Sequence, residues 1–504
     1  MMSQKIDLSR REFLLRSTLL SAGTVTAPFA MNLFSMNAAL ASQYNAPGDY
    51  KALVCIFLAG GNDHNNMVLA TDTLSWNGYL AARNIGGGAT IALPQANLLA
   101  ISPTTPKVDS VYGSSATRSF ALHPAMTPMQ TLFNAGRAAI VANVGPLIHP
   151  IANKLEYRNN SNWRPANLFS HSDQTTQWQS TDTTLKNYGW GGRMADLIKT
   201  SNTAQNFTCL SLSGNTAFLA GTTINQYQVS SNGTPVAISG FNNLFGSSGN
   251  ATQTVATAPT SGNLFEIEHA AVVQRAIDAQ SDLATVMTST AAPVVPAPAQ
   301  YTNPNTGTLQ TNALATQLQT VARIIAGRNT LGAHRQVFFV TLGGFDTHDG
   351  QAPNHANLMA RLAHALEYFD TTLSNLPDVN GGTSSDMRNS VTSFTASDFG
   401  RTFTSNGDGT DHGWGSHHFV VGGAVRGKEI YTVNDFPMTA VTGTSAYGTF
   451  NNPLDVGSGN LIPQISVDEY GGTLAKWFGL TPTEVRSVFP YLNTYGTADL
   501  GFMV

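Results

Sequence analysis

The fold is most directly predicted from the segment Ala52-Leu53-Val54-Cys55-Ile56-Phe57-Leu58, which is followed by Gly60-Gly61-Asn62-Asp63. Seven apolar residues in a row predict a strand that is buried on both faces. Such strands are typical of parallel sheets that are covered by helices. We expect the strand to span Tyr50–Ala59, and the glycine pair marks the turn by which the chain leaves the sheet.

Three further apolar runs predict strands of the same sheet, over Ala138–Val144, Val337–Leu342 and Val391–Ala396. Between the last two, a helix is expected from His355 to about Leu373, because its leucines recur at helical spacing. Strand, helix and strand in this order form a βαβ unit. Other helices are predicted over Met126–Asn134, Leu264–Met287 and Leu309–Gly327. The predicted class is therefore α/β, with a central, mostly parallel sheet and helices on both faces.

The middle of the chain has a different composition. Residues 222–260 are rich in Ser, Thr, Asn and Gly, and Ser289–Thr308 is an Ala, Pro and Thr-rich connector. We therefore predict a low-complexity insertion and connector at about 222–308, within a single large α/β domain over residues 42–504.

Composition excludes several classes of protein. Hydrophobic residues make up 42% of the 504 residues, enough for a sizeable core, whereas charged residues make up only 11%, against about 25% in an average domain. The net charge of −4 provides no cationic face for nucleic acid. Two cysteines, Cys55 and Cys209, exclude a disulfide-dense scaffold. They could form one bridge, but the apolar surroundings of Cys55 favour a buried free thiol.

The N-terminus carries an export signal. Arg10-Arg11 is followed by a weakly hydrophobic segment over Ser17–Leu40, and Ala39-Leu40-Ala41 has the form of a cleavage site. This pattern predicts a twin-arginine (Tat) signal peptide over residues 1–41, recognition by the Tat export machinery, and a periplasmic or extracellular mature protein. The alternative is an amphipathic anchor or a membrane span, which the Gly, Pro and Ser residues of the segment disfavour. Removal of its four positive and two negative charges leaves 22 positive and 28 negative charges, and no membrane span is expected in the mature chain.

Acidic residues follow three of the predicted strands: Asp63, Asp346 and Asp398. In an open α/β sheet the carboxyl ends of parallel strands line the functional crevice, so these carboxylates are expected to converge. Carboxylates that crowd together repel one another, and a divalent cation removes that repulsion. Mixed Asp and His ligands suit zinc or manganese, and an oxygen-rich shell suits magnesium or calcium. The predicted metal ligands are Asp63, Asp346, His348, Asp398, Asp411 and His412.

Each of these residues also has a structural interpretation. Asp63 and Asp398 could be turn or helix-cap residues, and Asp346 could cap the helix that follows it. Of the neighbours His417 and His418, we expect one to face the crevice and the other to face solvent.

Several short motifs resemble one known family. They are Gly60-Gly61-Asn62-Asp63, Leu122-His123-Pro124, Ser170-His171-Ser172-Asp173, Gly189-Trp190-Gly191-Gly192-Arg193, Gly344-Phe345-Asp346-Thr347-His348, Asp398-Phe399-Gly400-Arg401-Thr402 and Thr410-Asp411-His412-Gly413-Trp414-Gly415. Together they are similar to the DUF1501 family of exported bacterial proteins, over most of residues 48–480. That family is in turn similar to the alkaline phosphatase and sulfatase superfamily, which implies an alkaline-phosphatase-like fold.

This resemblance implies roles for further residues. Ser170 would be the nucleophile, and Arg401 or His171 would stabilise charge on the transferred group. Alternatively, Ser170 is the N-cap of a helix and Arg401 belongs to a scaffold ion pair. Phe399 stands where the superfamily usually has a metal ligand, so a single-metal or metal-free site remains open.

Two functions follow from these patterns. The first is a metal-dependent hydrolase of small anionic esters, phosphate or sulfate. The second is a non-catalytic secreted binding or assembly protein that keeps the fold with an eroded site. A serine hydrolase is disfavoured because no Gly-x-Ser-x-Gly motif follows a predicted strand. A dinucleotide enzyme is disfavoured because Gly60-Gly61-Asn62-Asp63 lacks the third glycine of the phosphate-binding fingerprint.

Overall fold

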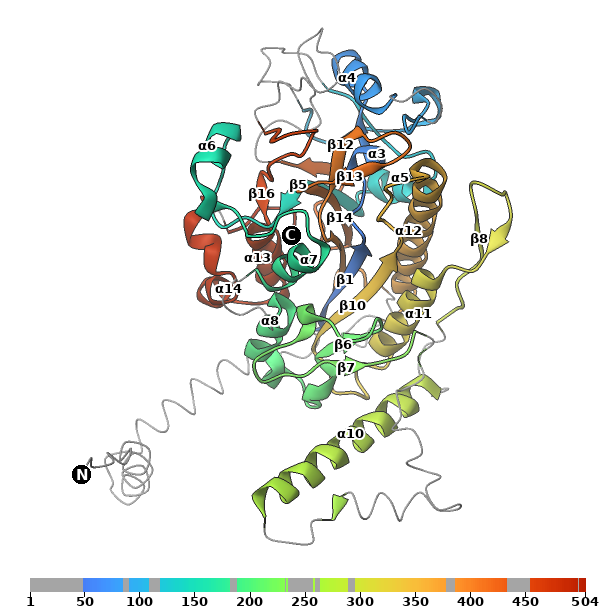
Figure 1. The fold of residues 1–504 in the computed structure, drawn as a ribbon. Coiled ribbons are helices and arrows are strands. Elements are labelled where there is room, and N and C mark those ends of the chain that lie inside the picture. The colour runs from blue at the N-terminus through green and yellow to red at the C-terminus, as the bar shows by residue number, and fades with distance from the viewer. Residues whose placement is uncertain are drawn as a thin grey trace, which may run out of the picture. The chain divides into compact units, whose positions relative to one another are not determined.

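The fold is built on a large mixed sheet, shown in a computed structural model in Figure 1. The structure describes residues 49–84, 90–107, 118–181, 188–231, 233, 257–258, 263–288, 295–377, 386–432, 454–496 and 498–504. The predicted export signal lies outside these residues, and the predicted insertion at 222–308 is described only in part. Residues Tyr50–Val504 form one compact unit.

The main sheet contains nine described strands in the order β15-β5-β14-β11-β1-β10-β6-β7, and β16 also pairs with β5. Every pairing is parallel except those that β14 makes with β5 and β11. The prediction of a mostly parallel α/β sheet is confirmed. The strands are β1 (Lys51–Ala59), β5 (Ala138–Gly145), β6 (Cys209–Ser211), β7 (Tyr227–Gln228), β10 (Arg335–Gly343), β11 (Val391–Ser397), β14 (Ser416–Gly422), β15 (Glu429–Tyr431) and β16 (Ile465–Ser466).

Helices cover both faces of this sheet (Figure 1). One face packs against α5 (Thr127–Asn134), α11 (Ala313–Ala326) and α12 (Gln351–Ser374), and the other against α8 (Trp190–Ile198) and α13 (Val467–Phe478). Strand β1 shows why both faces are apolar. Val54 and Ile56 join the core cluster that contains α12, whereas Cys55 between them faces the opposite side and is equally buried.

The remaining elements are short or lie outside the main sheet. The strands are β2 (Val68–Ala70), β3 (Leu99–Ile101) and β4 (Phe120–Leu122), the pair β8 (Tyr301–Thr302) and β9 (Leu309–Gln310), and the hairpin β12 (Arg401–Ser405) and β13 (Thr410–His412). The helices are α3 (His64–Met67), α4 (Thr73–Arg83), α6 (Lys154–Asn159), α7 (His171–Ser180), α10 (Leu264–Thr288) and α14 (Pro482–Val488). In the part of the chain that the structure describes, no helix has the length and apolarity needed to cross a membrane.

One predicted helix begins later than expected. The helix predicted from Leu309 starts at Ala313, because Leu309–Gln310 pairs with Tyr301–Thr302 as a short antiparallel ladder. Asn312 then caps the helix by accepting a hydrogen bond from the Leu314 amide.

The register of the central strands aligns their carboxyl ends at one edge. Ala59 lies opposite Gly343, and Leu58 lies opposite Ser397, so the chain leaves β1, β10 and β11 at the same level. Gly60 and Gly61 follow with φ of 115° and 83°, which side-chain-bearing residues rarely adopt. A Cβ on Gly60 would also collide with the main chain of Asp346. The glycine pair therefore lets two strand ends approach closely.

The two cysteines are both buried and free. Cys55 is on β1 and Cys209 is on β6, with β10 between them. Two inter-strand spacings of about 4.8 Å exceed the Cα separation that a disulfide can span. The expectation of a buried free thiol at Cys55 is confirmed.

Candidate functional site

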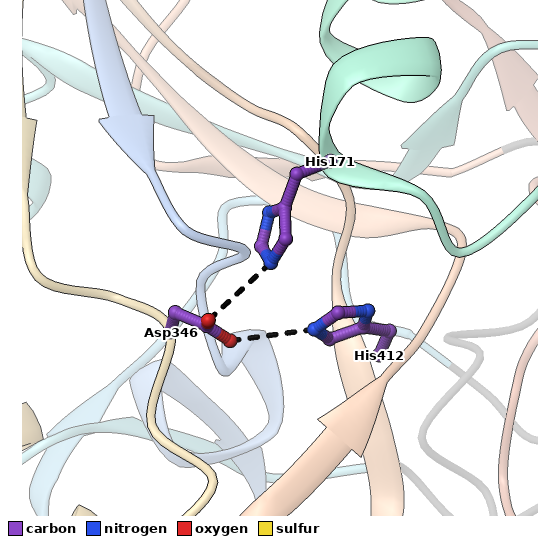
Figure 2. A group of neighbouring side chains, drawn as sticks. All are labelled: His171, Asp346 and His412. Carbon is purple, nitrogen blue, oxygen red and sulfur yellow. Dashed lines mark hydrogen bonds and ion pairs between the residues drawn. The ribbon is translucent and has the colours of Figure 1, made fainter.

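Three side chains meet at this edge of the sheet: His171, Asp346 and His412 (Figure 2). His171 is the first residue of α7, Asp346 follows β10, and His412 ends β13. One ligand atom from each lies within 4.8 Å of the others. His171 Nε2 is 3.4 Å from Asp346 Oδ2, and His412 Nε2 is 3.3 Å from Asp346 Oδ1. Their side chains are 35%, 47% and 23% exposed, so the group is accessible from solvent.

Each histidine is oriented by a contact at its other ring nitrogen. His171 Nδ1 lies 2.7 Å from Asp398 Oδ2, and His412 Nδ1 lies 2.8 Å from the Phe169 carbonyl oxygen. Because both partners are acceptors, each Nδ1 carries a proton, and Nε2, which faces Asp346, is the ring atom that could bind a cation when the histidine is neutral. The Nε2 atom of His171 is buried and makes no hydrogen bond with the described residues. A carboxylate or carbonyl behind a histidine is the usual support of a metal ligand.

Asp346 is held by Arg401. Its Oδ1 accepts a hydrogen bond of 3.0 Å from Arg401 Nη1. Burial tends to raise the pKa of the Asp346 carboxyl, but the hydrogen bond and charge of Arg401 outweigh burial and keep this pKa below its usual value. Arg401 itself is fully buried and also donates to the carbonyls of Gly60 and Thr410. Arg401 is therefore placed to orient Asp346 and not to contact a substrate. This agrees with the alternative in which Arg401 belongs to a scaffold ion pair.

His348 adds a further nitrogen to the group. Its Nε2 lies 2.9 Å from His412 Nε2 and 3.1 Å from Asp346 Oδ1. Its Nδ1 is 3.5 Å from Asp411 Oδ1, an ion-pair distance that is longer than the 2.7 Å hydrogen bond between His171 and Asp398. Burial lowers the pKa of His412, and the neighbouring His171, Arg401 and His348 add to this effect, which favours the neutral, ligating form.

These spacings fit a tetrahedral cation. Two atoms that each lie about 2.0–2.1 Å from a tetrahedral zinc ion are about 3.3 Å apart. Asp346 Oδ1 is 3.3 Å from His412 Nε2 and 3.1 Å from His348 Nε2, whereas the 3.4 Å contact of His171 Nε2 is with Asp346 Oδ2. The separations are thus of the size set by such an ion, with His171 facing the other carboxylate oxygen. A donor set of imidazole nitrogens and one carboxylate suits zinc, manganese or iron better than magnesium or calcium, which prefer oxygen.

Asp63 lies outside this group. Its carboxylate is fully buried and forms a bidentate ion pair with Arg83 of α4, at 2.5 and 2.9 Å. Gln351 Nε2 donates a third hydrogen bond to it, and Asp63 also caps α3 by accepting from the Asn65 amide. Burial tends to raise the pKa of Asp63, but the charge and hydrogen bonds of Arg83 lower it to about 2. This arrangement corresponds to the helix-cap alternative for Asp63.

Ser170 is the N-cap of α7. Its Oγ accepts from the Asp173 amide and donates to Asp173 Oδ2 at 2.7 Å. The hydroxyl thus has the two contacts that a capping serine makes. The structure therefore gives the helix-cap interpretation a concrete geometry, in which the hydroxyl proton of Ser170 points to the Asp173 carboxylate of the same helix.

Aromatic and histidine rings close the inner side of the site. The Phe399 ring lies 4.7 Å from the His171 ring and 4.6 Å from the His412 ring, between centroids.

The expectation that either His417 or His418 faces solvent is wrong, because both are buried. They sit on the central strand β14, where both faces of the sheet are covered. Burial lowers the pKa of His418 to about 3, so it stays neutral.

A cavity of about 320 Å³ lies against another face of α7. Ser172, Asp173, Thr176 and Gln177 line it from the helix, and Asp468 lines it from α13. At the spacing of an α-helix, these four positions lie on a different side of α7 from His171. The cavity is therefore separate from the group formed by His171, Asp346 and His412.

The fold and the site define an α/β protein with a solvent-accessible cluster of histidine and aspartate side chains suited to one divalent cation. A family model described as "Protein of unknown function (DUF1501)" matches residues 50–453. The chain therefore belongs to the DUF1501 family. A search of curated proteins found no match.

The structure also shows site residues that the sequence patterns did not reveal. The Phe169 carbonyl contacts His412, and the Gly60 amide and carbonyl contact Asp398 and Arg401. The Thr410 side chain accepts from Arg401 and donates to Gln351. Main-chain groups carry no residue-type signal. Thr410 and Gln351 are ordinary polar residues whose roles depend on tertiary contacts.

Proposed function

We propose that this protein is an exported metal-dependent hydrolase of phosphate or sulfate esters, with one cation held by His171, Asp346 and His412. The observation that carries the proposal is the convergence of these three ligand atoms within 4.8 Å, from elements that are far apart in sequence. His348 is placed to complete a fourth position, through its contacts with Asp346 and His412.

The remaining residues of the site would keep this group ready to bind. Asp398 and the Phe169 carbonyl hold the two histidines in the ligating tautomer, and Arg401 holds Asp346. A divalent cation held there would supply Lewis-acid polarisation of an ester oxygen and offset the charge of an anionic substrate. A solvent-accessible site is compatible with a small anionic ester.

Water is the nucleophile that this geometry favours. Ser170 Oγ is engaged in capping α7 and donates to Asp173 rather than to a base near the cation site. An alkaline-phosphatase-like serine mechanism would need a second metal or a base at that hydroxyl. We therefore propose a single-cation site with Ser170 in a supporting role.

Metal content provides the first test. The mature protein, purified without added metal, should contain about one zinc, manganese or iron ion per chain by elemental analysis. Asp346→Asn and His171→Ala should lose it. Asp278→Asn, an exposed carboxylate on α10, serves as the matched control and should keep it. A protein that contains no metal and takes up none on titration would contradict the proposal.

Activity provides the second test. The metal-loaded protein should hydrolyse at least one of p-nitrophenyl phosphate, bis-p-nitrophenyl phosphate and p-nitrophenyl sulfate, and Asp346→Asn should abolish this. Loss of activity with a chelator and its return with added metal would tie hydrolysis to the site. Bound metal without activity on any of the three would refute the ester-hydrolase assignment.

The second candidate is a non-catalytic secreted binding or assembly protein. The observation that favours it is the Phe399 ring, which packs against His171 and His412 and cannot ligate a metal. A protein equally stable with and without chelator, and without activity, would support this alternative.

Export through the twin-arginine pathway belongs to the same proposal and rests on Arg10-Arg11 and the segment after it. In a host with an intact Tat system, the full chain should reach the periplasm and be shortened. Replacement of both arginines by lysine should retain the precursor in the cytoplasm. Unchanged export of that variant would refute this route.

A further inference from the structure

We propose that Gln351 is a positioning residue for the cation site, which it links to the buried ion pair of Asp63 and Arg83. The inference rests on the proposed function, because it assumes that Asp346 and His412 hold a cation. It also gives the Gly60-Gly61-Asn62-Asp63 segment a role. Asp63 does not bind the cation itself but holds Gln351, which contacts the residues that position the ligands.

Gln351 lies at the start of α12 and is fully buried. Its Nε2 donates to Asp63 Oδ2 at 2.5 Å, and its Oε1 accepts from Thr410 Oγ1 at 2.6 Å. Thr347 Oγ1 donates to the same Oε1 at 3.2 Å. The Gln351 side chain thus connects Asp63 with Thr410 and with Thr347.

The connections lead on to two of the proposed ligands. Arg401 Nε donates to Thr410 Oγ1 at 2.9 Å, and Arg401 Nη1 donates to Asp346 Oδ1 at 3.0 Å. Thr410 also begins β13, which ends at His412. A substitution of Gln351 should therefore shift Asp346 through Arg401 and shift His412 through strand β13.

The direction of every hydrogen bond in this network is determined by its ends. Arg401 can only donate, so the Thr410 hydroxyl accepts from it. Because Gln351 turns its Nε2 to Asp63, it presents Oε1 to Thr410, and the Thr410 hydroxyl donates to that oxygen. The ionised Asp63 carboxylate can only accept, so Gln351 must donate to it. An amide is the one side-chain group of this length that accepts at one atom and donates at the other.

Gln351→Glu breaks this pattern with almost no change in shape. An ionised carboxylate there still accepts from Thr410 but faces the Asp63 carboxylate across a buried contact, where like charges repel strongly and raise the pKa of the new glutamate. A protonated glutamate would keep both hydrogen bonds, so Gln351→Met, which has no donor, is measured beside Gln351→Glu. Asp63→Asn in the same chain removes the like charge and restores the total charge near Arg83. Part of the ion pair is lost, because Asp63 Oδ2 accepts from both Gln351 Nε2 and Arg83 Nη1 and an asparagine NH₂ group there cannot accept from Arg83.

The experiment is a double-mutant cycle of Gln351→Glu and Asp63→Asn, with Zn²⁺ affinity measured by competition with a chromophoric chelator. Gln351→Glu should weaken Zn²⁺ binding about tenfold, as expected for outer residues that orient ligands. The double variant should recover part of this loss, because it removes the repulsion but weakens the contact with Arg83. The absorption spectrum of the Co²⁺-loaded protein, which depends on ligand geometry, should change in Gln351→Glu and shift back toward that of the wild type in the double variant.

Gln317→Glu is the matched control. Gln317 is also a buried glutamine, on α11, and its amide contacts the main chain of Thr341 away from the site. This variant should lose stability to urea but bind Zn²⁺ as the wild type does. If Gln351→Glu does not fold, Gln351→Met, which has similar length and no polar group, takes its place and should also weaken Zn²⁺ binding.

The outcomes separate this inference from the proposed function. A wild-type protein that binds no Zn²⁺ would overturn both. Wild-type binding with unchanged Zn²⁺ affinity and Co²⁺ spectrum in Gln351→Glu and Gln351→Met would leave the metal site intact and overturn the positioning role. Absence of rescue in the double variant would show that Gln351 does not act through Asp63.

Discussion

Replacement of Asp398 by asparagine should weaken metal binding without removing a ligand. Asp398 Oδ2 accepts from His171 Nδ1 at 2.7 Å, and its Oδ1 accepts from the Gly60 amide at 3.1 Å. Asparagine has only one acceptor oxygen. If that oxygen stays on the Gly60 amide, the new NH₂ group faces His171 Nδ1, and the ring proton moves to Nε2. The lone pair that would bind the cation is then lost.

The size of the effect follows from this geometry. Loss of the partner behind a ligating histidine typically costs about 10- to 100-fold in metal affinity, which corresponds to about 1.4–2.7 kcal/mol. If the asparagine rotates instead, His171 keeps its tautomer but the Gly60 amide faces another donor. That strained alternative costs a buried hydrogen bond, about 1–3 kcal/mol of folding stability.

A competition titration with Zn²⁺ measures the affinity of Asp398→Asn beside that of the wild type. Asp278→Asn on α10 is again the control and should bind as the wild type does. Urea denaturation shows whether each variant is folded. If folded Asp398→Asn bound Zn²⁺ within twofold of the wild type and also kept wild-type stability in urea, neither expected loss would have occurred. His171 would then not be a ligand that depends on Asp398, and the proposed centre would be refuted.

Three further predictions concern residues around the site. Ser170→Ala should lower the free energy of unfolding by about 1 kcal/mol, as for other N-caps. It should leave Zn²⁺ affinity and ester hydrolysis intact. A variant that is stable but inactive would identify Ser170 as the nucleophile. Arg83→Met should cost about 3–5 kcal/mol in urea denaturation, because it leaves the Asp63 carboxylate buried without its ion pair; a loss below 1 kcal/mol would contradict the importance of this pair. Burial lowers the pKa of His64 to about 4 and of His418 to about 3. Above pH 6.5 both residues are neutral in the folded and the unfolded state, and below pH 6.5 they oppose folding increasingly as the pH falls toward 4. At pH 4.5 each should cost about 2.5 kcal/mol relative to pH 7.5, and equal urea midpoints at the two pH values would contradict this.

Much of the fold could be predicted because the relevant signals are local. A run such as Leu53–Leu58 can be buried on both faces only in a covered sheet, and β1 indeed lies between two strands and two helical layers. The direction of β14 could not be predicted in this way. It depends on the connection from β13, and an apolar strand has the same composition in either direction.

The site was predictable only in part. Residue type and position after predicted strands singled out Asp346, His348 and His412. His171 entered only through the family resemblance, as a residue that would stabilise charge on the transferred group and not as a metal ligand. The convergence of these residues required the register that aligns the ends of β1 and β10. Asp398 and Asp411 prove to be neighbours behind the histidines, at 2.7 and 3.5 Å, rather than members of the converging group.

Asp63 shows most clearly where the sequence stops being informative. From the sequence alone, an acid after a glycine turn could equally be a ligand, a cap or half of an ion pair. Arg83 decides between these by meeting it from α4, 20 residues further along the chain. Burial patterns and turn residues are properties of short segments, so the sequence alone determined the layered α/β architecture and the set of candidate ligands. Which acids remain available to a cation depends on partners brought together by packing, and only the tertiary structure decided that.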